Sequence, residues 1–297
     1  MLSFCKNSPS IKPKSKIISM ANPKFISKFK IEGAPIVKKI DEIAKEYIPS
    51  EDSLPIGISD FDNAMDGGIR GGELIVVSGP TGSGKSLWCQ NLTINLSETN
   101  VPSMWFSYEM NPYYLSQRFK QIDSQKDLLA YGPTTLGCNS LGFLEKHIKE
   151  AWQEYACKTI FIDHLHYLIP LRESTSTSLM IGAIVRQLKL LAVKLDVIIF
   201  LIAHTKKIYQ DEQLNLSSIR DSSLISQESD YVFLIERLKK ESKKLEQSGS
   251  TWSNQTRISL AKNRRTGKLM YITCNYQNGK LIPVTDQFEN YELEPKY

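Results

Sequence analysis

A glycine-rich loop that could hold phosphate is the first feature of this sequence that indicates chemistry. It directly follows the apolar run 74–77, has the pattern G-x-x-x-x-G-K-S, and consists of Gly79, Pro80, Thr81, Gly82, Ser83, Gly84, Lys85 and Ser86. The glycines let successive backbone N–H groups turn toward phosphate oxygens, and the following helix adds its positive N-terminal end. Lys85 can reach the outer phosphates, and the Ser86 hydroxyl can bind Mg²⁺. The pattern predicts a nucleotide hydrolase rather than a glycine-rich turn that binds nothing.

Two carboxylates follow buried strands and are predicted to lie beside this loop. Asp163 ends the apolar run 160–162, where a second Mg²⁺ ligand is expected because ligands of open α/β sheets bind at the carboxyl ends of parallel strands. Glu109 closes the run 104–108, and a carboxylate there can orient or deprotonate the water that attacks a γ-phosphate. The alternatives are that Asp163 caps a turn and that Glu109 favours the helix start signalled by Asn111-Pro112.

Histidines follow two of the predicted strands. His204 comes directly after the apolar run 197–203, so it is expected at the same sheet edge, where a donor can sense the γ-phosphate; the alternative is an ordinary loop residue. His164 and His166 alternate after Asp163 and suggest a metal pair, but no third ligand is evident in the sequence. The sequence therefore does not favour zinc.

The elements that must position these side chains alternate along the chain. The predicted strands are short apolar runs near 73–78, 104–108, 159–162 and 197–203. The predicted helices are amphipathic stretches near 85–98, from 112, near 141–156 and near 179–195. This alternation is typical of a parallel sheet with crossover helices, so the predicted fold class is α/β with a mainly parallel central sheet and flanking helices.

The last third of the chain has a different pattern. Strands are expected near 231–235, 257–262 and 269–276, without apolar helices between them. Such strands predict antiparallel hairpins at one side of the sheet. The charged, serine-rich stretch 237–255 is expected to be an exposed excursion between two of them.

The net charge of +5 over 297 residues comes from the N-terminal end. Residues 1–50 contain ten lysines against four acidic residues, so the rest of the chain is close to neutral. We expect a basic arm and a short amphipathic helix over 36–47, followed by one domain over 51–297. The arm could contact nucleic acid or a neighbouring subunit, or could be a solvated tail.

Composition also bounds the location of the protein. No apolar run is long enough to cross a membrane, so no membrane partner is expected. The five scattered cysteines form no C-x-x-C pair and indicate reduced thiols without structural zinc, which favours the cytoplasm. Organelle targeting is less favoured, because the serine-rich, acid-poor start contains no arginine and no clear amphipathic pattern.

Several segments together resemble one protein family. The run 56–62 and the glycine pairs up to Leu74 resemble the segment that leads into the RecA-like P-loop ATPase module of DnaB-type replicative helicases, and similar segments occur in RadA-like and KaiC-like proteins. The stretch 107–110 resembles the helicase segment that holds the catalytic glutamate. The stretch 163–166 resembles the magnesium strand, with His166 where bacterial members usually have Gln. The stretch 203–205 resembles the phosphate-sensor segment.

Two later segments resemble the helicases more than their relatives. The stretch 219–230 is similar to the loop that lies on single-stranded DNA inside the ring, with Arg220 at the matching position and Ser223 in place of the usual Gly. The stretch 262–267 is similar to the segment that reaches the γ-phosphate of the neighbouring subunit. The resemblance assigns Lys262 and Arg264 to that role, with Arg265 as the substitute; the alternative is a basic hairpin tip.

The resemblance, which covers residues 52–284, implies a motor. Its ATP and Mg²⁺ would lie at the boundaries of a homo-oligomeric ring, commonly a hexamer, that moves on single-stranded DNA. Lys206, Lys207 and Arg220 would contact the DNA, largely through phosphates. A primase or other replisome proteins would be candidate partners. The alternatives are a RadA-like recombination ATPase and a KaiC-like nucleotide-gated scaffold.

Overall fold

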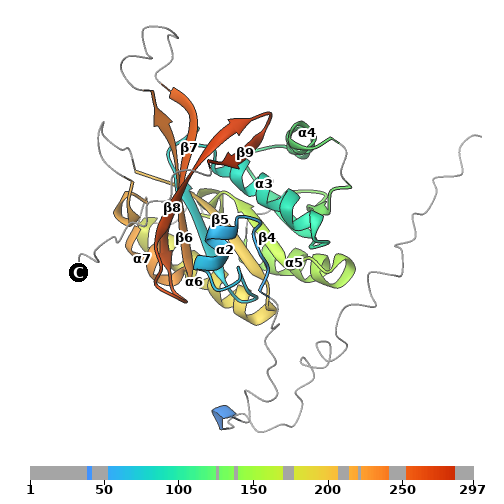
Figure 1. Ribbon diagram of the computed structural model, residues 1–297. Coiled ribbons are helices and arrows are strands. Elements are labelled where there is room, and N and C mark those ends of the chain that lie inside the picture. The colour runs from blue at the N-terminus through green and yellow to red at the C-terminus, as the bar shows by residue number, and fades with distance from the viewer. Residues whose placement is uncertain are drawn as a thin grey trace, which may run out of the picture. The chain divides into compact units, whose positions relative to one another are not determined.

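The computed structural model describes residues 39–41, 53–124, 127–136, 140–169, 177–206, 214–219, 222–240 and 252–284 (Figure 1). Contacts within the chain divide it into the units Met1–Ile48 and Pro49–Tyr297, and the sheet belongs to the second. The predicted basic arm and most of the predicted helix over 36–47 lie outside the described residues.

A nine-stranded sheet forms the centre of the second unit, in the order β3-β2-β4-β5-β1-β6-β7-β8-β9. The strands are β1 (Leu74–Gly79), β2 (Ser103–Ser107), β3 (Ala130–Tyr131), β4 (Thr159–Asp163), β5 (Ile198–His204), β6 (Tyr231–Lys239), β7 (Trp252–Asn263), β8 (Met270–Gln277) and β9 (Lys280–Pro283). Strands β1 to β6 pair in parallel, and β6 to β9 pair antiparallel. The predicted mainly parallel sheet with C-terminal antiparallel hairpins is confirmed.

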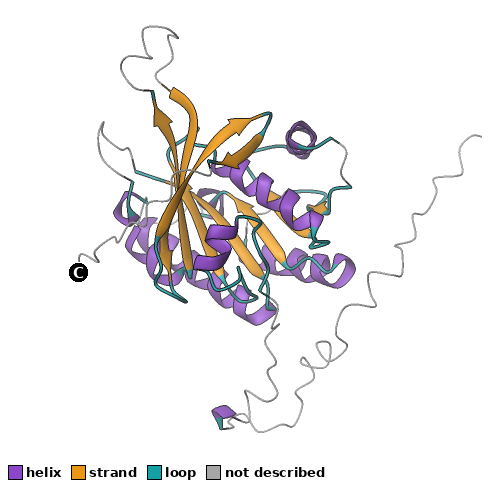
Figure 2. Cartoon of the chain, viewed as in Figure 1, coloured by secondary structure: helices purple, strands orange, loops and turns teal. Residues whose placement is uncertain are grey.

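Helices cover both faces of the parallel strands (Figure 2). They are α2 (Ser59–Ala64), α3 (Lys85–Glu98), α4 (Pro112–Ile122), α5 (Leu141–Tyr155), α6 (Thr177–Leu195) and α7 (Ser222–Glu228). One apolar core joins α2, α3 and α4 to the sheet through residues such as Val77 and Trp88. The other joins α5 and α6 through residues such as Val76 and Leu188. Because both faces are covered, β1, β2 and β4 are buried along their whole length.

Local signals explain the helix starts. The Asn111 side chain accepts a hydrogen bond of 2.7 Å from the Tyr113 N–H, and Pro112 is the first residue of α4. The Ser140 side chain accepts one of 3.2 Å from the Phe143 N–H at the start of α5. Both helices begin where the sequence predicted them.

The hairpin of β6 and β7 departs from the prediction. These strands remain paired out to Lys239 and Trp252, so the expected excursion over 237–255 is shorter than predicted. Two short strands, β3 and β9, were not predicted, because two and four residues carry too little apolar pattern to be recognised.

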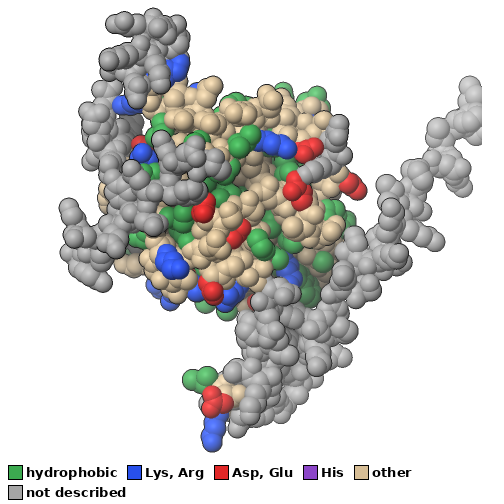
Figure 3. All heavy atoms as spheres, in the orientation of Figure 1, with side chains coloured by type: hydrophobic (Ala, Val, Ile, Leu, Met, Phe, Trp, Pro, Cys, Tyr) green, Lys and Arg blue, Asp and Glu red, His purple; other side chains and the backbone are tan. Residues whose placement is uncertain are grey.

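The described residues have a surface of mixed charge and free cysteine thiols. Acidic and basic side chains are interspersed on the face seen in Figure 3. Cys89, Cys157 and Cys274 are buried free thiols. The helices of the described ranges include none with the length and apolarity that crossing a membrane requires.

Candidate active site

The phosphate loop connects the end of β1 to the start of α3. Gly82 and Gly84 have φ angles of 76° and 99°, in the left-handed region that favours glycine. Gly79 has a different reason, since a β-carbon there would lie 2.2 Å from the Ile235 carbonyl oxygen on β6. The loop is thus shaped both by backbone conformation and by close packing against the neighbouring strand.

Lys85 is the first residue of α3 and is held inside this loop. Its buried Nζ donates hydrogen bonds to the carbonyl oxygens of Gly79 at 2.9 Å and Pro80 at 2.8 Å. Burial lowers the pKa of this amine, and the nearby charges of Asp163 and Glu109 oppose the shift. A buried cation that donates to neutral carbonyls is suited to exchange them for phosphate oxygens.

Ser86 and Asp163 form the pair that could hold Mg²⁺. The Ser86 hydroxyl donates a 2.7 Å hydrogen bond to Asp163 Oδ2. Asp163 is 3% exposed, and its Oδ1 has no hydrogen-bond partner among the described residues. Burial, with the charge of Glu109 as a smaller contribution, raises the pKa of this carboxyl to about 6, against the opposing effects of Ser86 and Lys85. Two oxygen donors and a buried, incompletely satisfied carboxylate fit a hard cation such as Mg²⁺.

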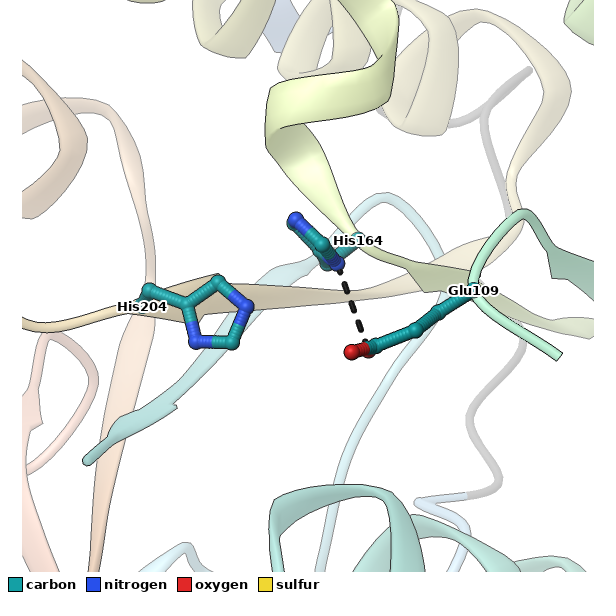
Figure 4. Close-up of side chains that lie close together, drawn as sticks. All are labelled: Glu109, His164 and His204. Carbon is teal, nitrogen blue, oxygen red and sulfur yellow. Dashed lines mark ion pairs between the residues drawn. The ribbon is translucent and has the colours of Figure 1, made fainter. Parts of the chain in front are cut away.

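Glu109, His164 and His204 point toward one another from the ends of three neighbouring strands (Figure 4). Glu109 Oε2 lies 3.4 Å from His164 Nδ1, and the rings of His164 and His204 have centroids 4.4 Å apart. Strand register explains the meeting, because Ser107 pairs with Asp163, which pairs with Ile202. Glu109 and His204 therefore lie at the sheet edge predicted for them. His164 was considered only together with His166, and its neighbours Glu109 and His204 were missed.

The electrostatics of His164 follow from its position. Its side chain is 11% exposed, whereas that of Glu109 is 49% exposed. Burial lowers the pKa of His164, and Glu109 opposes this shift. A neutral imidazole is consequently favoured beside a solvent-accessible carboxylate.

Lys262 and Arg264 lie at the amino-terminal ends of the parallel strands, opposite the phosphate loop. Asn263 on β7 pairs with Tyr231 on β6, which pairs with Ile75 near the start of β1. The phosphate loop follows the other end of β1, and six strand residues span about 17 Å. Neither side chain can thus serve the phosphate loop of its own chain without rearrangement of the sheet.

The two adjacent arginines have different surroundings. The Arg264 side chain is 63% exposed, with Nη1 3.6 Å from Asp230 Oδ1. The Arg265 side chain is 18% exposed, forms an ion pair with Glu73, and donates to the carbonyl oxygens of Met65 and Gly68. Arg265 is thus committed to internal contacts, and Arg264 is the one presented to solvent.

Lys262 is bound to the end of α7. Its Nζ donates to the carbonyl oxygens of Ser226, Gln227 and Ser229. A lysine among the last carbonyls of a helix satisfies groups that lack partners within the helix and complements the helix dipole.

The predicted DNA contacts are only partly described. Lys206 is exposed after the end of β5, and its N–H donates to the Ser218 carbonyl oxygen at 2.9 Å. Lys207 and Arg220 lie outside the described residues. An isolated β-bridge pairs Thr205 with Ile219, so the segments that lead to Lys207 and Arg220 lie side by side. The structure therefore brings these two segments together directly after His204.

Known proteins similar to this chain include DnaB helicases. Residues 134–281 match the family of the DnaB-like helicase C-terminal domain. The replicative DNA helicase DnaB of Treponema pallidum is 22% identical over 290 residues, which are 88% of this chain and 63% of the relative. A shorter match to DnaB of a Nostoc species is 37% identical over 73 residues, 24% of this chain and 8% of the relative. The chain thus spans less than two thirds of the length of these relatives.

Solved structures match the fold. A DnaB-like replicative helicase whose description includes its interactions with primase aligns with a TM-score of 0.67 at 17% identity, covering 84% of this chain and 68% of the other. A solved ATPase domain aligns with the same TM-score and identity, covering 82% of this chain and 96% of that domain. The RecA-like ATPase fold predicted from the sequence is confirmed.

Proposed function

We propose that this chain is the ATPase motor of a replicative DNA helicase, because residues 134–281 match the DnaB-like helicase C-terminal domain. The motor assembles into a homo-oligomeric ring, with the hexamer as the expected form. It hydrolyses ATP with Mg²⁺ at subunit boundaries and moves along single-stranded DNA. A primase is the candidate protein partner and the cytoplasm the expected location.

The main support for this proposal is that the phosphate loop and Arg264 lie at opposite ends of the parallel strands. The phosphate loop lies at the carboxyl ends of the parallel strands, and the exposed Arg264 lies at their other ends. Two subunits can pack so that Arg264 of one faces the phosphate loop of the next. Arg264 then completes the active site of that neighbour. Repetition of this head-to-tail contact closes a ring when the rotation between subunits permits.

The site residues divide the work of ATP hydrolysis among phosphate binding, metal binding and activation of water. Lys85 and the loop N–H groups hold the phosphates, and Ser86 and Asp163 hold Mg²⁺, which neutralises charge between the β- and γ-phosphates. Glu109 orients or deprotonates the attacking water. Arg264 of the neighbouring subunit stabilises charge that develops in the transition state.

The sheet edge also supports coupling to DNA. His204 ends β5 beside Glu109 and His164, and the next residue, Thr205, is bridged to Ile219. Loss of the γ-phosphate can thus displace the segments that contain Lys206 and Arg220. Contacts of these residues with phosphates would bind DNA irrespective of sequence and with strong salt dependence.

A mixing experiment tests the proposal. Arg264→Ala subunits keep the phosphate loop and lack the trans arginine, whereas Lys85→Ala subunits have the reverse defect. We expect each alone to be inactive and mixed assemblies to regain ATPase activity. Lys268→Ala, an exposed basic residue of the same hairpin tip, is the matched control and should be active alone. Absence of recovery in assemblies shown by native mass measurement to contain both subunits would contradict a finger in trans.

DNA measurements separate the alternatives. Single-stranded DNA should raise the ATPase rate, and a forked duplex should be unwound. An ATPase indifferent to DNA would favour the KaiC-like scaffold, and DNA stimulation without unwinding would favour the RadA-like ATPase. Arg220→Ala should weaken binding of all sequences alike.

A further inference from the structure

The histidines of this chain are unevenly distributed. The chain contains four, and three of them, His164, His166 and His204, gather at one sheet edge. The rings of His164 and His204 have centroids 4.4 Å apart, and the His166 ring lies 5.5 Å and 6.0 Å from them. The proposed motor uses His204 in coupling to DNA and assigns no role to His164 or His166.

We propose that Glu109, His164 and His204 form a binding site for one transition-metal ion of the zinc class. One potential ligand atom from each residue lies within 4.8 Å of the others. Tetrahedral zinc, with bonds of about 2.0–2.2 Å, places neighbouring ligand atoms about 3.3–3.5 Å apart. The 3.4 Å between Glu109 Oε2 and His164 Nδ1 already has this spacing. A shift of the His204 side chain completes a two-histidine, one-carboxylate set.

Ligand chemistry separates this site from the Mg²⁺ site. Ser86 and Asp163 offer only oxygen atoms, which suit Mg²⁺, whereas two imidazoles suit zinc and its neighbours in the first transition series. The site retains an open coordination position, since three protein ligands leave one for water, substrate or the nearby His166.

The surroundings of the site suit a bound ion. The three ligands come from the ends of β2, β4 and β5, which are adjacent in the sheet, so the backbone holds them in fixed register. His164 is buried, and Glu109 is half exposed, so the ion has access from solvent on the carboxylate side.

A consequence follows that rests on the proposed function. A metal ion bound to Glu109 engages the carboxylate that would orient or deprotonate the attacking water. Zinc bound here should therefore inhibit ATP hydrolysis while nucleotide binding by the phosphate loop continues. The site would make the motor sensitive to free zinc.

Cobalt(II) is a direct probe, because its visible spectrum distinguishes tetrahedral from octahedral coordination. The full chain, titrated in millimolar Mg²⁺ without nucleotide, should bind one Co²⁺ with an intense tetrahedral-type absorption, and Zn²⁺ should displace it. His164→Ala and His204→Ala should each weaken binding at least about tenfold. The control is His147→Ala, which removes the fourth histidine, on α5.

The outcomes discriminate among explanations. Asp163→Asn should retain Co²⁺, and loss of Co²⁺ in that variant or displacement by Mg²⁺ would assign the ion to the Mg²⁺ site and overturn the proposal. Unchanged affinity in both His164→Ala and His204→Ala, with folding checked by circular dichroism, would overturn it as well. Because Co²⁺ binding needs no ATP hydrolysis, this test succeeds or fails independently of the ATPase assignment.

Discussion

The two ends of the parallel strands satisfy their charged groups differently. At the carboxyl ends, Asp163 is buried with one oxygen that lacks a described partner. At the amino ends, Asp230 Oδ2 accepts hydrogen bonds from the Leu74 N–H and from Lys189 Nζ, and Arg265 is paired with Glu73. Buried polar groups are normally satisfied, so the unpaired oxygen of Asp163 fits a ligand that binds at the carboxyl ends. Arg264, which is 63% exposed at these amino ends, marks the surface expected to meet a neighbour.

The largest effect is expected for Arg264, the exposed charge at the amino-terminal ends of the parallel strands. Arg264→Ala should lower the ATPase rate about 10³- to 10⁵-fold, because a trans arginine stabilises transition-state charge. The free energy of unfolding should change by less than about 0.5 kcal/mol, since the side chain is exposed. Steady-state kinetics and urea unfolding measure the two. A large loss of stability would mean that Arg264 belongs to the internal network.

The second-largest effect is expected for Glu109, at the carboxyl ends of the parallel strands. Glu109→Gln should lower the turnover about 10²- to 10⁴-fold while nucleotide affinity is retained, because only proton transfer or water orientation is removed. Single-turnover kinetics with fluorescent nucleotide binding would check both. Hydrolysis at the parental rate would show that another group activates the water.

Arg265→Ala should have the opposite profile to Arg264→Ala. Removal of one partner of this mostly enclosed pair leaves the Glu73 charge without its cation, so the free energy of unfolding should fall by up to about 3–5 kcal/mol. Burial already raises the pKa of Glu73 despite Arg265, so loss of the arginine should raise this pKa further. Denaturant unfolding of both arginine variants side by side is the measurement, and equal stabilities would contradict the contrast between them.

A smaller effect is expected at the end of α7. Lys262→Met removes the donor to three carbonyl oxygens that water can partly replace, so stability should fall by about 1 kcal/mol. Amide exchange should increase in α7 rather than in β7. Lys268→Ala, in the same hairpin, should leave exchange in α7 unchanged.

The smallest effect lies away from both edges, between α5 and α6. Hydrogen bonds from Lys149 and Lys194 lower the pKa of Glu145 to about 2. A lowered carboxyl pKa contributes stability above the unfolded-state value near 4.5, and this contribution is lost as the pH falls toward 2. Lys194→Met should move the pKa of Glu145 toward its ordinary value in an NMR titration. An unchanged pKa would mean that solvent screens the pair.

Local patterns were sufficient for many features of the fold and site. The phosphate loop, Glu109, Asp163 and His204 were placed at one sheet edge because each follows a continuous apolar run, which predicts a strand buried on both faces. The starts of α4 and α5 were predicted because capping is a matter of a few adjacent residues. The extra pairing of β6 with β7 was missed, since charged strand ends resemble loops in sequence.

By itself, the sequence determined the phosphate-binding loop, the alternation of strands and helices and the family resemblance, because these depend on neighbours along the chain. Tertiary structure decided which strand ends meet. Placing β4 between β2 and β5 joins Glu109, His164 and His204, and pairing β7 with β6 puts Arg264 at the far edge. It also decided that Arg265 is mostly enclosed and Arg264 is exposed, although the two basic residues are adjacent in the sequence. Strand order and burial arise from contacts between distant segments, which no local pattern specifies.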